Sequence, residues 1–123
     1  MLNRLNMSGP APFSIVKKPN DLLFFDNLAL YYVLQNTPPR VLARVFLKAD
    51  SRLSGSLLGI LSPKQRETVH FMMTQENDDD AAKNLDAQNG LCLISEGLIA
   101  RGLIKKQGAH FFGVPGHEKV EPG

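Results

Sequence analysis

Residues 61–73 read LSPKQRETVHFMM, and this stretch contains the clearest helix start in the chain. Ser62 stands at the N-cap position, Pro63 at the first helical position and Gln65 three residues after the serine. This spacing forms a capping box, and proline is tolerated there because its missing N–H would have no partner. The stretch therefore predicts a helix from residue 63. Its buried side is expected to carry Val69, Met72 and Met73.

Three more helices are predicted before residue 62. Asp26 is a suitable N-cap for a helix that carries Leu28, Leu30, Tyr31 and Leu34. Thr37 is expected to cap the next helix, with Pro38 at its first position and Val41, Leu42, Val45 and Phe46 on its apolar face. Asp50 or Ser51 then opens a short helix that carries Leu53, Leu57, Leu58 and Leu61.

A last, longer helix is predicted at about 80–101. The acidic run 77–80 would cap it and favour its positive N-terminal end. Gly90 and Gly97 would let a neighbouring helix approach closely, and Gly102 is suited to end the helix. One side is expected to be lined by Leu85, Leu91, Ile94, Leu98 and Leu103. Residues 103–112 are compatible with a short hairpin or an extended stretch.

These elements predict an all-α, compact multi-helix domain at residues 21–114, with room for a short C-terminal β hairpin. Hydrophobic residues make up 43% of the 123, which is enough for one modest core. Residues 1–20 are interrupted by prolines and glycine and are expected to form a flexible arm. Residues 115–123 are expected to form a flexible tail.

The composition gives no support for an enzyme, a metal site or a cofactor. His70, His110 and His117 lie far apart in sequence and have no metal-ligand spacing to Cys92. Cys92 lies among leucines and isoleucine, which indicates a buried small apolar residue rather than a nucleophile. The chain lacks the apolar run of a signal peptide or of a membrane span, so a cytoplasmic domain without membrane insertion is expected.

Charged side chains on the helix from residue 63 form the candidate binding site. Lys64 and Glu67 are three residues apart, and Arg66 and His70 are four apart, so each pair shares a ridge of the helix. The simplest interpretation is a solvated face, and the functional one is an electrostatic contact surface for another protein. Phe71 would lie at one flank, where an exposed ring could anchor a partner.

Residues 22–113 resemble the C-terminal domain of the flagellar rotor protein FliG. The segments that carry the resemblance are LLFFDNLALYYVLQNTPPRVLARVFLKAD, RLSGSLLGILSPKQRETV, and the last long helix with the turn after it. They share the family's order of helices, caps and apolar spacing. The resemblance implies an all-helical domain that acts in torque generation and direction switching. It implies charge contacts with a membrane-embedded stator, at the cytoplasmic face of the inner membrane.

The resemblance also implies which residues make those contacts. Lys64 matches a basic residue early in the family's charged helix, and Lys48 lies next to the place of a preceding lysine. The family's paired acids fall on Phe71 and Met72, and a later basic position falls near Asp80. Other proteins, such as rotor or stator components, are the implied partners. The contact residues expected in this chain are Lys48, Lys64, Arg66, Glu67 and Phe71.

A second resemblance, to winged-helix domains, rests on residues 93–114. The segment LISEGLIARGLIKKQGAHFFGV has the form of a helix, a glycine turn and a β wing. Such a domain would bind DNA or a protein. The helix before the wing carries more acidic than basic side chains, which argues against DNA because phosphate contacts supply much of the binding energy.

Overall fold

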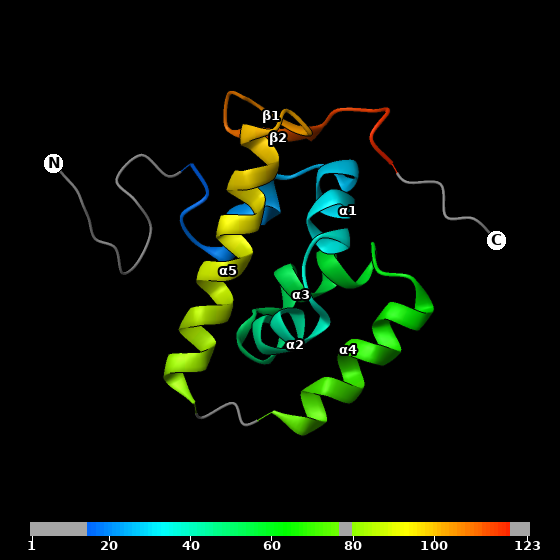
Figure 1. Ribbon diagram of the computed structural model, residues 1–123, viewed down its shortest axis with the longest axis vertical. Coiled ribbons are helices and arrows are strands. Elements are labelled where there is room, and N and C mark those ends of the chain that lie inside the picture. The colour runs from blue at the N-terminus through cyan, green and yellow to red at the C-terminus, as the bar shows by residue number, and fades with distance from the viewer. Residues whose placement is uncertain (1–14, 77–79, 119–123) are drawn as a thin grey trace, which may run out of the picture.

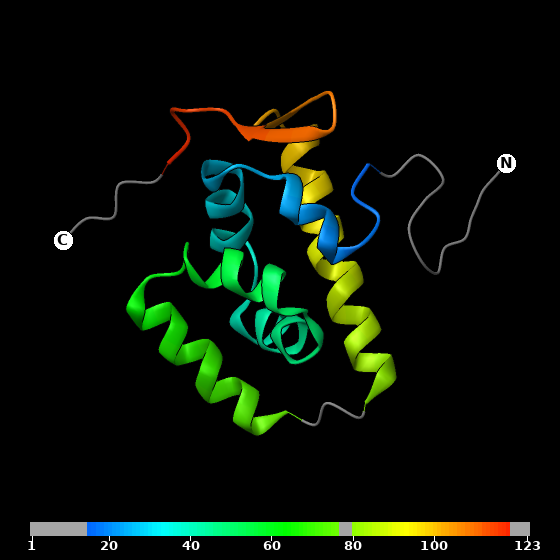
Figure 2. The same ribbon diagram turned by 180° about the vertical axis from the view of Figure 1, so that it is seen from behind.

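The computed structural model describes residues 15–76 and 80–118. A long helix runs along one side, a second helix lies apart from it, shorter helices lie between them, and a hairpin covers one end (Figures 1 and 2). The fold is all-α with a two-stranded C-terminal hairpin, as the sequence predicts. The elements in order are the 3-10 helix η1 (Pro19–Phe24), α1 (Asn27–Gln35), α2 (Pro39–Lys48), α3 (Ser51–Leu58), α4 (Pro63–Gln75), α5 (Ala81–Ala100), β1 (Ile104–Gln107) and β2 (His110–Gly113).

Side-chain caps fix four of the helix starts. The carboxylates of Asp26, Asp50 and Asp80 accept hydrogen bonds from backbone N–H groups three residues later, over 2.8, 2.9 and 3.1 Å. Ser62 forms the complete capping box: its hydroxyl accepts from the Gln65 N–H at 3.1 Å, and the Gln65 side chain accepts from the Ser62 N–H at 3.0 Å. Each cap satisfies N–H groups that have no partner within the helix, and all four confirm the sequence-based assignment.

The start of α2 differs from the prediction. The helix begins at Pro39, with Pro38 as its N-cap. Pro38 precedes another proline, and a residue in that position is disfavoured in the α conformation. The buried hydroxyl of Thr37 donates instead to the Val33 carbonyl at 2.6 Å. Thr37 therefore serves the C-terminal end of α1, where carbonyls lack helical partners.

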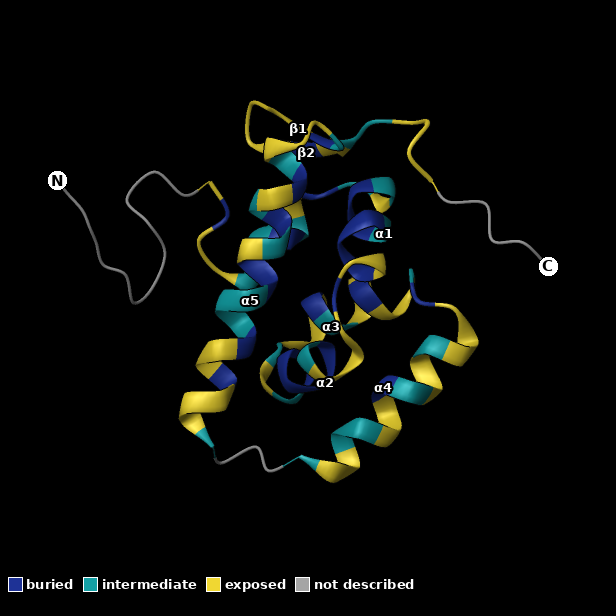
Figure 3. Ribbon diagram, in the orientation of Figure 1, coloured by how far each residue is buried: buried dark blue, intermediate teal, exposed yellow. Residues whose placement is uncertain are grey.

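The core forms where α2 packs against both α4 and α5, and where α1 packs against α5 and β2. Buried residues face this interior, and exposed ones face outward (Figure 3). On α5 the predicted apolar side is partly wrong, because Leu85 is 57% exposed. Six residues separate it from Leu91, which places the two on different sides of a helix. The buried stripe comprises Asn84, Ala87, Leu91, Ser95 and Leu98.

The glycines of α5 have different roles from those expected. A Cβ at Gly90 or Gly97 would meet nothing within 4 Å, so neither glycine admits a neighbouring helix. Gly102 does end the helix, at a φ of +83°. The Gly102 and Leu103 N–H groups both donate back to carbonyls of the last turn. This is a Schellman ending, which satisfies carbonyls that the helix itself leaves unpaired.

Asp26 fastens the hairpin to α1. Its carboxylate accepts from the Gly113 N–H at 3.0 Å in addition to capping α1, and its own N–H donates to the Phe111 carbonyl at 2.9 Å. Gly113 approaches α1 so closely that a Cβ there would lie 2.6 Å from Leu28 Cγ. A side chain at residue 113 would therefore push the hairpin off α1.

The folded body begins before residue 21. Val16, within the expected arm, is 1% exposed, and its N–H donates to the Glu96 carboxylate. At the other end, the Tyr32 hydroxyl donates to the Val114 carbonyl at 2.6 Å. Residues 1–14 and 119–123, which belong to the expected arm and tail, lie outside the described residues. In the part of the chain that the structure describes, none of the helices has the length and apolar character needed to cross a membrane.

Replacing Gly113 with alanine should destabilise the domain by about 1–3 kcal/mol, because the added methyl overlaps Leu28. The matched change Gly97→Ala, in an open helix interior, should stabilise it by about 0.5–1 kcal/mol. Urea unfolding followed by helical circular dichroism measures both. Equal stability of the two variants would contradict the close approach at Gly113.

Candidate protein-contact face on α4

One side of α4 is covered by α2 and the other side is open. Val69 is buried, while Met72 and Met73 pack half-buried against the core, as predicted. Lys64, Glu67, His70 and Phe71 are exposed, and we call these four residues the α4 face. Phe71 is 63% exposed, so most of its ring is open to solvent beside the charged residues. The predicted position of Phe71 outside the core is therefore confirmed.

Arg66 has a structural role beside this face. Its Nη1 donates to the carbonyls of Leu58 and Leu61, at 3.1 and 3.3 Å. A cation is favourable at a helix C-terminus, so Arg66 ties the end of α3 to the beginning of α4. Whether Arg66 also contacts a partner stays a prediction, but its substitution would disturb the turn as well as any contact.

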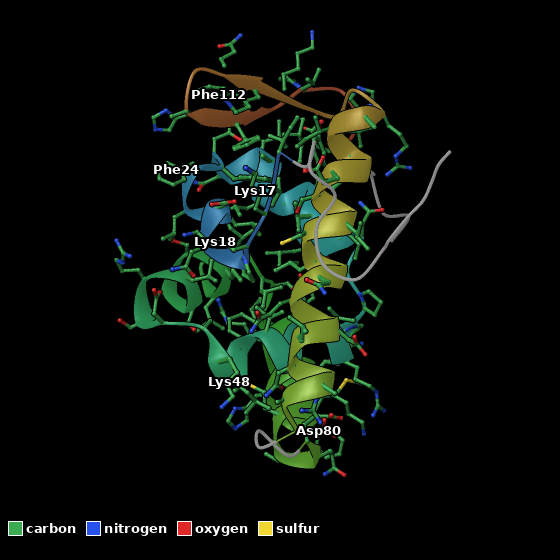
Figure 4. All side chains as sticks on the ribbon, turned by 90° about the vertical axis from the view of Figure 1, so that its left-hand side faces the viewer. Lys17, Lys18, Phe24, Lys48, Asp80 and Phe112 are labelled. Carbon is green, nitrogen blue, oxygen red and sulfur yellow. The ribbon has the colours of Figure 1, made fainter. Side chains whose placement is uncertain are left out.

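Lys48 lies beside different elements from Lys64. It ends α2 and lines a small cavity of about 140 Å³ together with Lys18, Asn20 and Gln88. Lys64 lines another cavity, which shares no residue with the first. Lys48 is labelled in Figure 4, on the side of the molecule where α5 faces the viewer. The structure thus brings Lys64, Glu67 and Phe71 together on one helix and places Lys48 at a separate hollow.

An apolar groove adjoins the start of α4, and sequence reasoning missed it. Its volume is about 270 Å³, and Lys64 and Thr68 lie at its edge. The apolar part of the lining comes from Leu34, Pro39, Leu42, Leu61 and Val69. Such a hollow is large enough to receive a side chain, and Lys64 would place a positive charge beside it. The groove depends on how α2 and α4 cross, and local sequence patterns do not specify that crossing.

A buried ion pair holds the far end of α4. Arg44 of α2 and Glu76 after α4 lie 2.8 Å apart, with side chains only 5% and 8% exposed. Arg44 also donates to the Asn84 side chain of α5 at 3.0 Å. Arg40, whose side chain is 71% exposed, adds an outer contact to Glu76 at 3.1 Å. This network links α2, the end of α4 and α5, and so fixes where the α4 face points.

Groups that could support other chemistry are separated or shielded. Cys92 is buried, and burial raises the pKa of its thiol to about 11. Within residues 15–76 and 80–118, no three His, Cys, Asp or Glu side chains are close enough to hold a metal ion. Of the acidic run, Asp80 caps α5, and residues 77–79 lie outside the described part.

Replacing Glu76 with alanine should cost about 3–5 kcal/mol, because Arg44 would keep a buried charge without its carboxylate. Arg40→Ala removes only the exposed partner of the same carboxylate and should cost less than about 1 kcal/mol. Chemical unfolding of the two variants checks the difference. If both changes have the same small effect, the buried pair does not hold α4.

Cys92 should not react with a thiol reagent such as DTNB in the native protein at pH 8, and should react fully in urea. The raised pKa leaves almost no thiolate at that pH, and burial blocks access. The neutral thiol's contribution to stability is complete below the unfolded value of 9.0 and is lost as the pH rises through about 11. Rapid native labelling at pH 8 would show that the thiol is accessible.

No protein-family model matches this chain, and no curated protein or solved structure is significantly similar to it. What the α4 face binds is therefore inferred from its own chemistry and from the order of the elements.

Proposed function

We propose that this chain is a non-enzymatic protein-binding domain of the flagellar rotor, and that the α4 face contacts its partner. The observation that carries the proposal is the exposure of Phe71 beside Lys64 and Glu67. Among the described residues, neither Lys64 nor Glu67 forms an ion pair, so both charges remain available. An exposed aromatic ring can serve as the apolar anchor of a protein contact, and charged side chains beside it suit the polar rim of such a contact.

The order of elements supports the flagellar part of the proposal. Five capped or proline-led helices follow one another, which is the order that the resemblance of residues 22–113 implies, and the charged helix α4 has an exposed side. The partner would be a rotor or stator component at the cytoplasmic face of the inner membrane. The proposal includes no catalytic step and no cofactor.

The departures from the family pattern suggest a different balance of contacts. Where the family has paired acids, this chain has Phe71, which is exposed, and Met72, which packs half-buried. Asp80 lies near a basic position of the family, and its carboxylate caps α5. We infer that binding here relies on an apolar anchor at Phe71, with Lys64 supplying orientation and association rate.

A winged-helix role is the alternative. The hairpin that follows α5 favours it, with Lys105 exposed on β1. This role predicts affinity for duplex DNA that falls steeply with salt, because bound lysines release counterions from phosphates. A flat fluorescence titration with duplex DNA at low salt would remove this alternative.

Deleting the gene in its own organism should leave cells that swim poorly or switch direction abnormally. The double change Phe71→Ala and Lys64→Glu should fail to restore swimming, because it removes both the anchor and the charge. Leu93→Ala, at an exposed leucine on α5, is the matched control and should restore swimming fully. Swimming speed, switching frequency and filament number measure the outcome. Normal swimming of the deletion strain or of the double variant would contradict the proposal.

A further inference from the structure

The outer side of the hairpin forms a second exposed surface of the domain, far from α4 in the sequence. The strand register defines which side chains lie on it. Lys105 pairs with Phe112, and Gln107 pairs with His110. Side chains alternate along a strand, so these four point away from the core, on the side opposite buried Phe111. We call Phe24, Lys105, His110 and Phe112 the hairpin face.

Phe24 extends this face from another element. Phe25 forms a parallel bridge to Phe111, and their rings pack 4.5 Å apart in the core. Phe24 precedes Phe25 and points the other way, so its ring lies 5.9 Å from that of His110. His110 in turn lies 6.4 Å from Phe112. The three rings form one continuous aromatic cluster, in which Phe24 is 47% and Phe112 41% exposed.

Three lysines, two before η1 and one on β1, add positive charge to this side of the molecule. Lys17, Lys18 and Lys105 form no ion pair with any described carboxylate. Figure 4 shows Lys17, Lys18, Phe24 and Phe112 on one side of the molecule. The alternation of β1 places Lys105 on the outer side as well.

Carboxylates of this part of the fold bond to the backbone, as Glu96 does to the Val16 N–H. Asp21 accepts from the N–H groups of Lys17 and Lys18, at 2.9 and 3.3 Å. Asp26 accepts from those of Ala29 and Gly113. These bonds direct both acids toward the main chain, and neither acid forms an ion pair with Lys17, Lys18 or Lys105.

We propose that the hairpin face, together with Lys17 and Lys18 on the same side of the molecule, binds an acidic peptide segment that lays an aromatic or leucine side chain over the rings of Phe24, His110 and Phe112. Carboxylates of the segment would pair with the lysines, and the aromatic or leucine side chain would cover the exposed rings. Single-stranded nucleic acid fits less well. The planes of Phe24 and His110 meet at 71° and those of His110 and Phe112 at 42°, so the rings do not offer parallel stacking surfaces to successive bases.

Fluorescence anisotropy of the full chain tests this proposal. The probe is a labelled peptide in which Asp and Glu flank Phe and Leu, compared with its Asn and Gln counterpart and with a labelled oligothymidine. The acidic peptide should bind, and the neutral peptide should bind about tenfold or more weakly. Phe112→Ala and Lys105→Glu should each weaken acidic-peptide binding about tenfold. Both positions are exposed, so circular dichroism should be unchanged.

Phe71→Ala is the control from the α4 face and should bind the acidic peptide as the unchanged protein does. This separates the two surfaces, because loss of the flagellar role would leave peptide binding intact. Equal binding of the acidic and neutral peptides would overturn the proposal. So would unchanged binding by Phe112→Ala, or binding of the oligothymidine in place of the peptide.

Discussion

The contact between Arg44 and Glu76 is the constraint on which the position of α4 depends. Both side chains are almost fully buried, and Arg44 also bonds Asn84, so one guanidinium connects three helices. Elsewhere α4 packs against α2 through few large apolar side chains, with only Val69 fully buried. The buried ion pair adds to this packing a directional contact, which removal of either partner would leave as an uncompensated buried charge. The α4 face is presented in a fixed direction for this reason.

At the opposite end of the domain, a single residue again holds two elements together. Asp26 caps α1 and holds β2, and Gly113 lets the two approach to a distance that no side chain would permit. The same attachment turns Phe111 inward and Phe112 outward. Each fastening therefore supports one of the two exposed faces. Between the two faces, α2 and α5 pack against each other.

The helix starts were predictable because their signals are local. Asp26, Asp50, Ser62 and Asp80 each bond an N–H three residues later, and that contact needs no distant partner. The cap predicted for Thr37 is wrong because its hydroxyl lies between the C-terminal end of α1 and the N-terminal end of α2. In the structure the hydroxyl donates to the buried Val33 carbonyl of α1.

The candidate site was only partly predictable. The exposure of Phe71 followed from helical periodicity, but the placement of Lys48 beside η1 and α5 depends on tertiary packing. Arg66 was predicted as a contact residue, and its bonds to the carbonyls of Leu58 and Leu61 were not predicted because these carbonyls lie across a turn. The hairpin face was missed because it requires Phe24 and Phe112, far apart in sequence, to meet at His110.

Photo-crosslinking in living cells tests most directly whether the α4 face binds a component of the flagellar motor. A benzophenone amino acid would replace Phe71, with the same substitution at the exposed Leu93 as control. We predict a crosslinked product from residue 71 that contains a rotor or stator protein, and none from residue 93. Crosslinking to no motor component from residue 71, or the same products from both positions, would contradict the assignment of this face.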